Sequence, residues 1–244
     1  MKPYFYNPLY LLRNAAGIVW LVSTPFLNLA AFILTGFRQK IVFRLLRMEG
    51  AVLLWILNVK VRVDENLLAL DPRSGKNFLF IANHQSMLDI LVVYSLVPVP
   101  LSFIAKKELF WFPFLNIHLW LAGCVSIDRH SLRRSYRDIQ TAVDLLKRKR
   151  SIFIFPEGTR QTEDHIGPFK PGFLKLAQEA GVDLVPIVMR GSGKVMIRGS
   201  FLVDPRESIT VSLGRPLPVT GRDAVRQPDT VRQQFTEIYA RLKK

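Results

Sequence analysis

Short apolar runs alternate with amphipathic segments over most of the chain after residue 64. Residues 151–155 form one such run, which is typical of a buried strand. Residues 131–150 instead carry apolar side chains three and four positions apart, which predicts a helix with one buried face. Strands that alternate with helices predict an α/β fold, a layered mixed sheet flanked by helices. By the same criteria we expect further strands at 77–82, 102–105, 123–127, 184–189 and 208–213, and further helices at 86–96, 171–180 and 230–242.

The first quarter of the chain has a different pattern, because no charged residue occurs between residues 15 and 36. This segment reaches the ~20 apolar positions that a membrane-spanning helix needs. We expect Pro25 to kink or break the helix, since proline lacks the amide hydrogen that a helix interior requires. A second apolar stretch follows at 51–59, after a basic segment that contains Arg38, Lys40, Arg44 and Arg47.

Two apolar helices with a polar break and basic flanks predict a membrane-associated helical hairpin. We therefore divide the chain into an N-terminal helical segment, 1–62, and an α/β domain, 63–244. A single straight span and a buried helix of a soluble protein are the alternatives. A cleavable signal peptide fits poorly, because the apolar region is too long and Lys2 is the only charge before Arg13. We expect monotopic or hairpin-anchored insertion at the cytoplasmic face of a bacterial inner membrane.

The charge balance favours anionic partners. The chain has 34 Lys and Arg against 19 Asp and Glu, a net charge of +15. Because the mean hydropathy is +0.18 and the apolar residues concentrate near the N-terminus, anionic membrane lipids are favoured over nucleic acid. No nucleic-acid-binding motif is present either. The single cysteine, Cys124, excludes an internal disulfide and a multi-cysteine zinc site, and the four histidines lack metal-binding spacing.

His84 and Asp89 form the first candidate site, at the point where strand signals give way to helix signals. In a regular helix, five residues turn through about 500°, which would place the two side chains about 140° apart. They can meet only if His84 precedes the helix on a bent backbone, a start for which Asn83 and Ser86 are suited as caps. Asp89 would then orient the imidazole as a general base. The alternatives are a capping pair without chemistry and a Ser86-His84-Asp89 triad, which lacks the Gly-x-Ser-x-Gly pattern.

A second cluster follows the apolar strand at 151–155. Gly158 lets a ligand approach the backbone closely, and Arg160 can bind a phosphate through two parallel hydrogen bonds. Glu157 can hold that arginine or bind a substrate hydroxyl. Two further cations, Lys106 and Arg129, follow two other predicted strands. Taken alone, they would be solvent-exposed loop residues.

Four blocks of the sequence resemble the 1-acyl-glycerol-3-phosphate (lysophosphatidate) acyltransferase family of glycerolipid acyltransferases. The resemblance covers roughly residues 80–190, with its blocks in the expected order, and the N-terminal apolar pair resembles the membrane-inserting helices of this family. One departure is Asn116, where the second block often carries glycine. The four blocks are 83–89, which carries His-x-x-x-x-Asp, 106–129, 155–160, which reads Phe-Pro-Glu-Gly-Thr-Arg, and 185–187, which reads Val-Pro-Ile.

The resemblance implies the roles of these residues. His84 would be the general base and Asp89 its orienting partner. The acceptor site would contain Glu157, Gly158, Thr159 and Arg160, with Lys106 and Arg129 assisting at the phosphate. The implied reaction transfers an acyl group from acyl-CoA or acyl-carrier protein to the 2-hydroxyl of lysophosphatidic acid, giving phosphatidic acid without a covalent acyl-enzyme, a metal or a cofactor. Acylation of a different lysolipid and a non-catalytic basic lipid-binding protein are the alternatives.

Overall fold

A seven-stranded mixed sheet forms the centre of the molecule. The computed structural model describes residues 7–63, 76–128, 132–161, 165–196, 199 and 202–242, with backbone alone at 132–136. The strand order is β1-β7-β6-β2-β5-β3-β4, and the antiparallel pairing of β6 with β7 makes the sheet mixed. The strands are β1 Lys60–Val63, β2 Leu79–Ala82, β3 Leu101–Lys106, β4 Val125–Ile127, β5 Ser151–Ile154, β6 Leu184–Arg190 and β7 Ser208–Leu213.

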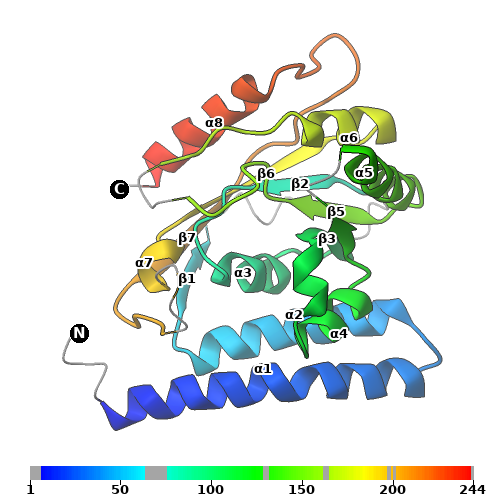
Figure 1. Cartoon of the computed structure of the whole chain (residues 1–244). Coiled ribbons are helices and arrows are strands. Elements are labelled where there is room, and N and C mark those ends of the chain that lie inside the picture. The colour runs from blue at the N-terminus through cyan, green and yellow to red at the C-terminus, as the bar shows by residue number, and fades with distance from the viewer. Residues whose placement is uncertain are drawn as a thin grey trace.

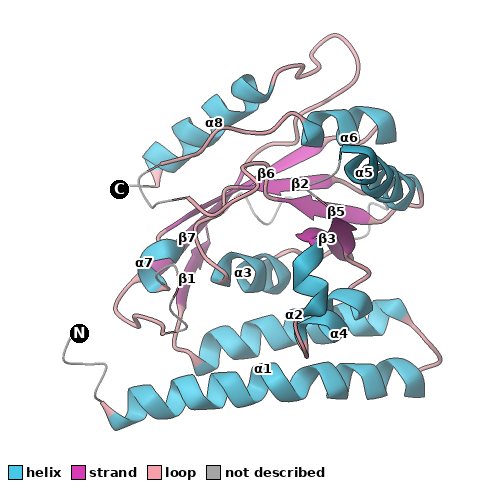
Figure 2. Ribbon diagram, viewed as in Figure 1, coloured by secondary structure: helices cyan, strands magenta, loops and turns pink. Residues whose placement is uncertain are grey.

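Helices cover both faces of this sheet, as Figures 1 and 2 show. On β2, Phe80 and Ala82 point into a core shared with α1, α2 and α3, whereas Leu79 and Ile81 point into a second core shared with α5, α6 and α8. This alternation follows from the two-residue repeat of a strand. The helices are α1 Pro8–Leu34, α2 Gln39–Ile56, α3 Leu88–Leu96, α4 Leu115–Leu121, α5 Leu132–Lys147, α6 Gly172–Ala180, α7 Ser192–Val195 and α8 Pro228–Arg241, with a 3₁₀ turn η3 at Lys107–Trp111.

The predicted α/β fold is confirmed, with differences at the ends of elements. All six predicted strands and all four predicted helices of the α/β part are present. The helix predicted at 86–96 begins two residues later, at Leu88, because residues 85–87 form a turn. The edge strand β1 was not predicted, since its sequence KVRV alternates charged and apolar residues over only four positions. It pairs in parallel with β7, directly after the hairpin, and the division of the chain at residue 62 stays a prediction.

The N-terminal hairpin consists of α1 and α2, joined by a turn at residues 35–38. The predicted break at Pro25 is wrong, because α1 is helical without interruption for 27 residues. Pro25 is buried, and the packing of α1 against α2 and α4 offsets the hydrogen bond that proline removes. The second helix also begins earlier than predicted, at Gln39, so the basic segment is helical. By length and hydropathy, α1 is a candidate membrane span.

A buried carboxylate connects three helices at the hairpin. Glu49 of α2 is 7% exposed, and its Oε1 accepts hydrogen bonds from Thr24 Oγ1 of α1 at 2.5 Å and from His118 Nε2 of α4 at 2.6 Å. Its Oε2 accepts a hydrogen bond from Asn28 Nδ2 of α1 at 2.7 Å. Next along α2, Gly50 lets the helix lie against α3, since a Cβ there would be 3.0 Å from the Leu91 carbonyl oxygen. The hairpin is therefore packed onto the α/β layers through specific polar and close contacts.

Candidate active site

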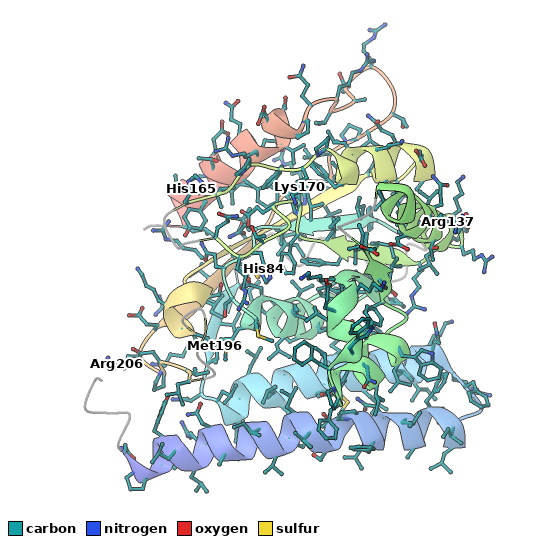
Figure 3. The ribbon with its side chains drawn as sticks, viewed as in Figure 1. His84, Arg137, His165, Lys170, Met196 and Arg206 are labelled. Carbon is teal, nitrogen blue, oxygen red and sulfur yellow. The ribbon has the colours of Figure 1, made fainter. Side chains whose placement is uncertain are left out.

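His84 lies in the short link between β2 and α3, and Asp89 lies in the first turn of α3. The bend in this link brings His84 Nδ1 to 2.8 Å from Asp89 Oδ2. Asp89 is fully buried, whereas the His84 side chain keeps 16% of its surface exposed. Figure 3 shows His84 close to the start of α3, in the middle of the molecule. The structure thus places the two residues as the five-residue spacing requires.

The Asp89 carboxylate also shapes the backbone around it. Its Oδ2 accepts the backbone N–H groups of Gln85 and Ser86, each at 2.8 Å. Ser86 Oγ accepts the N–H of Leu88 at 3.3 Å, as a helix cap does, and lies 3.3 Å from the Met196 carbonyl oxygen, to which it donates. No hydrogen bond joins Ser86 Oγ to His84 among the described residues, so the geometry does not favour a serine triad.

Asn83 does not cap the helix, contrary to the expectation from its sequence position. Its Nδ2 donates to the Met189 carbonyl oxygen at 2.7 Å, and its Oδ1 accepts the Met189 N–H at 2.8 Å. The side chain therefore binds both backbone groups of a β6 residue, as a neighbouring strand would. This fixes the end of β2 immediately before His84.

The contacts of the imidazole determine which of its nitrogens can act as a base. A carboxylate can only accept hydrogen bonds, so Nδ1 carries the proton toward Asp89 and Nε2 keeps its lone pair. The ring stacks on Phe155, with centroids 3.8 Å apart and planes inclined by 13°. Sequence reasoning gave Phe155 no role, although it is the first residue of the third block. Nε2 makes no hydrogen bond with any described residue.

His84 opens onto a cavity of about 510 Å³ that both polar and apolar side chains line. The polar part of the wall includes Lys106, Thr159 and Arg160. The apolar part of the wall comes from α3, β3, η3 and α4, and also from the N-terminal hairpin. Side chains of the apolar part include Leu21, Leu46, Ile90, Leu91, Phe103 and Leu119. Sequence reasoning missed the contribution of the hairpin, because no local pattern shows which distant helices meet.

The loop after β5 contributes Gly158, Thr159 and Arg160 to the cavity wall. Gly158 has φ +72°, which favours glycine, and a Cβ there would lie 3.1 Å from Lys170 Nζ. Arg160 lines the cavity, and no described carboxylate forms an ion pair with it. Lys106 is half-exposed, with Nζ 3.4 Å from Glu108 Oε1. Arg129, the remaining predicted cation, lies outside the described residues.

Glu157 differs from the rest of the loop, because it is 3% exposed and is not among the residues that line the cavity. Its Oε2 accepts the His84 N–H at 3.1 Å, and its Oε1 accepts the Gly167 N–H at 3.2 Å. Burial, with a smaller contribution from the negative charge of Asp89, raises the pKa of Glu157 to about 7. The two backbone hydrogen bonds and Arg232 oppose this rise in pKa. The structure thus separates Glu157 from the other residues predicted to bind substrate.

Comparison with known proteins shows the family of the chain. The family model described as Acyltransferase matches residues 58–190, which include His84, Asp89 and the loop that carries Arg160. The chain belongs to the acyltransferase family. This confirms the family resemblance drawn from the four blocks.

Several relatives of this acyltransferase have more specific names. A 1-acyl-sn-glycerol-3-phosphate acyltransferase of Limnanthes douglasii is 30% identical over 172 residues, which cover 70% of this chain and 56% of that protein. A protein of the same name from Salmonella typhimurium is 34% identical over 163 residues, 64% of each chain. The chain thus spans between about half and two thirds of the length of these curated relatives.

A solved structure resembles the whole acyltransferase fold. The crystal structure of the 1-acyl-sn-glycerophosphate (LPA) acyltransferase from Thermotoga maritima has a TM-score of 0.80 and covers 96% of both chains. Its sequence is 23% identical, so the likeness concerns the fold. The match includes the N-terminal hairpin, because only a small part of this chain lies outside the matched region.

Proposed function

We propose that this acyltransferase moves a fatty acyl group from acyl-CoA or acyl-carrier protein to the 2-hydroxyl of lysophosphatidic acid, giving phosphatidic acid. The observation that carries the proposal is the His84–Asp89 pair opening onto a cavity that Arg160 and many apolar side chains line. A hydroxyl, a phosphate and an acyl chain are the three groups that such a cavity suits. The names of the relatives support the same acceptor.

In this proposal, His84 Nε2 accepts the proton of the acceptor hydroxyl as the oxygen attacks the thioester carbonyl. Asp89 stabilises the imidazolium that forms, because its charged oxygen already binds Nδ1–H. The tetrahedral intermediate then expels the thiolate, which takes the proton from the imidazolium and leaves as a thiol. Each proton and electron pair is accounted for without a covalent acyl-enzyme, so the scheme needs no cofactor beyond the acyl thioester.

Arg160 supports the assignment of a phosphate-bearing acceptor. Arg160 lines the cavity, and a guanidinium can bind a phosphate through two parallel hydrogen bonds. Lys106 and Thr159 add a second cation and a hydroxyl to the same region. Arg129 belongs to the proposed phosphate site by family resemblance alone. A charged headgroup held here would place its neighbouring hydroxyl beside His84.

The experiment that tests the proposal measures acyl transfer from labelled acyl-CoA and acyl-carrier protein to a panel of lysolipids. Loss of the base in His84→Ala is expected to lower kcat about 10²–10⁴-fold, with lysophosphatidic acid as the preferred acceptor. Equal rates for wild type and His84→Ala would refute the mechanism. Preference for a lysolipid without a phosphate monoester would favour the second candidate, a different acceptor.

We also propose that the outer face of α1 is inserted into a membrane. Its inward face carries Asn14, Thr24 and Asn28, whereas its outward face is apolar. This is the reverse of a helix on a water-soluble protein, whose apolar side faces the core. Packing of α1 along α2 favours monotopic insertion over a free-standing span. The exposed apolar residues of α1 include Leu9, Leu12, Ile18, Val19, Leu27 and Leu34.

Aromatic and basic side chains complete this surface. Phe114 and Trp120 make ring contacts with Phe26 and Phe32 of α1, and both keep substantial exposure. Tryptophan rings such as that of Trp120 are enriched at membrane–water interfaces. The basic residues at the start of α2 would meet anionic headgroups, at about 1 kcal/mol each. We place this surface at the cytoplasmic face of a bacterial inner membrane.

Vesicle flotation tests the membrane surface directly. The variant Val19→Lys with Leu27→Lys is expected to lose most binding to phosphatidylglycerol-containing vesicles, because each apolar side chain contributes about 1.5–3 kcal/mol when buried. Ala240→Lys on α8, on the opposite side of the molecule in Figure 1, is the matched control. Release of the wild-type protein from vesicles by high salt alone would contradict insertion.

A further inference from the structure

Glu157 is placed behind His84 rather than in the substrate cavity. It is 3% exposed, although the three residues that follow it all line the cavity. A turn causes this separation: the Gly158 N–H donates to the Phe155 carbonyl oxygen at 3.0 Å and directs the chain back toward β2. An acceptor in the cavity therefore meets Arg160, whereas the carboxylate of Glu157 is covered by protein.

The carboxylate of Glu157 is fully engaged by backbone donors. One oxygen accepts the N–H of His84, at 3.1 Å, and the other accepts the N–H of Gly167, at 3.2 Å. Because both partners are donors, only the ionised carboxylate offers an acceptor to each of them. An amide or a protonated carboxyl would direct a donor toward one of these two N–H groups. The negative charge of Glu157 thus serves to bind two backbone N–H groups of the protein and not a ligand.

The same loop holds the other polar group of the His84 backbone. The Gln161 N–H donates to the His84 carbonyl oxygen at 2.7 Å, so residues 157–161 bind the N–H and the C=O of one residue. Asn83, the preceding residue, is held to Met189 through both ends of its amide. Because the imidazole is also bonded to Asp89 and stacked on Phe155, its position depends on backbone and side-chain contacts together.

We infer that Glu157 is a positioning residue, which sets the location of the catalytic base through the His84 backbone and does not bind the acceptor. The inference rests on the proposed function, since it takes His84 as the base. It assigns to the carboxylate of the third block a role distinct from that of Arg160 three residues later. Misplacing a reacting group by about 1 Å can cost on the order of 10²-fold in rate, so a tether of this kind matters for catalysis.

Titration of Glu157 gives this tether a pH dependence. The groups that face it are His84 and Asp89 from the β2–α3 region and Arg232 from α8. Burial raises the pKa of Glu157 to about 7, so the carboxylate changes its charge near neutrality. When it is protonated, one of the two N–H groups loses its acceptor, and protonation on Oε2 releases the His84 N–H, so that the His84 backbone is held less firmly. One pH unit below the pKa, only about a tenth of the molecules keep the ionised form.

The test is the kinetics of Glu157→Gln with acyl-CoA and lysophosphatidic acid between pH 6 and pH 8. We expect kcat at pH 8 to fall about 10- to 100-fold while the KM for lysophosphatidic acid stays within about twofold. The ratio of wild-type to variant kcat is expected to decrease from pH 8 to pH 6, because protonation weakens the same tether in the wild type. The matched control is Glu237→Gln, an exposed carboxylate on α8, which should leave both constants unchanged.

Two outcomes separate this inference from the proposed function. If wild-type enzyme transfers acyl groups and His84→Ala does not, but Glu157→Gln raises KM at constant kcat, Glu157 binds the acceptor and the inference is wrong. If wild type acylates no lysolipid, the proposed function itself fails. Circular dichroism checks folding; should Glu157→Gln be unfolded, Glu157→Asp, which keeps the charge on a side chain one methylene shorter, is measured with the same criteria.

Discussion

Replacing Asp89 by asparagine tests the orientation of the base with the least change in shape. The Asp89 Oδ2 atom accepts three N–H groups, from the His84 ring and from two backbone amides. The asparagine amide is expected to turn its oxygen toward these three donors, which keeps them satisfied. The reverse orientation is unfavourable, because it would direct the NH₂ group toward three N–H groups. The fold is therefore expected to survive, with a loss of about 1–2 kcal/mol as charge-assisted hydrogen bonds become neutral ones.

The cost to catalysis follows from the lost charge. A carboxylate and an imidazolium 2.8 Å apart attract each other by about 6 kcal/mol at an effective dielectric constant of about 20. If roughly half or more of this attraction is realised in the transition state, the barrier rises by about 3–5 kcal/mol. A rise of about 1.36 kcal/mol lowers the rate tenfold, so kcat should fall about 10²–10⁴-fold.

The assay compares initial rates of acyl transfer to lysophosphatidic acid in mixed micelles, with thermal unfolding measured on the same preparations. Asp144→Asn, an exposed carboxylate on α5, is the control for the charge change and should match wild type. A folded Asp89→Asn variant with kcat within about threefold of wild type would refute the role of Asp89. A similar loss in Asp144→Asn would instead point to a general effect of charge.

Three further outcomes are expected. Arg160→Gln should raise the KM for lysophosphatidic acid about 10- to 100-fold, since a hydrogen bond to a charged group contributes about 1.5–3 kcal/mol; an unchanged KM would place the phosphate elsewhere. Glu49→Ala should lower the free energy of unfolding by about 3–5 kcal/mol in denaturant titrations, because three polar groups on α1 and α4 lose their hydrogen bonds to this buried carboxylate; a loss under about 1 kcal/mol would contradict this. Because the pKa of Glu157 is raised to about 7, the folded state binds this proton more tightly than the unfolded state does. This contribution to the free energy of unfolding is therefore present below about pH 4.5 and is lost as the pH rises to about 7. Glu157→Gln should remove this dependence from a plot of the free energy of unfolding against pH. Parallel plots for wild type and variant would disprove it.

Local patterns were sufficient to predict most of the α/β part. The apolar runs of β2, β5 and β6 and the stripe on α5 show strong periodicity, and Gly181 ends α6 in the left-handed conformation as its position predicts. The prediction from proline was less reliable, because α1 stays helical at Pro25, where tertiary packing offsets the lost hydrogen bond. The edge strand β1 has too little apolar sequence to be distinguished from a loop. Residues whose structure is determined by packing over long distances were therefore the ones that local reasoning placed wrongly.

The candidate site shows the same division between local and distant contacts. Spacing predicted that His84 and Asp89 meet on a bent backbone, because both lie in one short segment. It could not predict that Asn83 binds Met189, which lies 106 residues later, or that Glu157 binds the backbone of His84 across 73 residues. Residue type suggested a substrate ligand for Glu157, which stays a prediction, and could not show that this side chain is 3% exposed.

The proposed membrane insertion of α1 has a consequence for attempts to make a water-soluble form of this enzyme by truncation. Leu21, Leu46 and Glu49 belong both to the hairpin and to the wall of the cavity that His84 faces. Removing α1 and α2 would open one side of that cavity, uncover the hairpin-facing side of α3 and leave His118 without its carboxylate. A solubilised enzyme should therefore be sought by replacing the outward apolar side chains of α1 with polar ones, while the inward face is left intact.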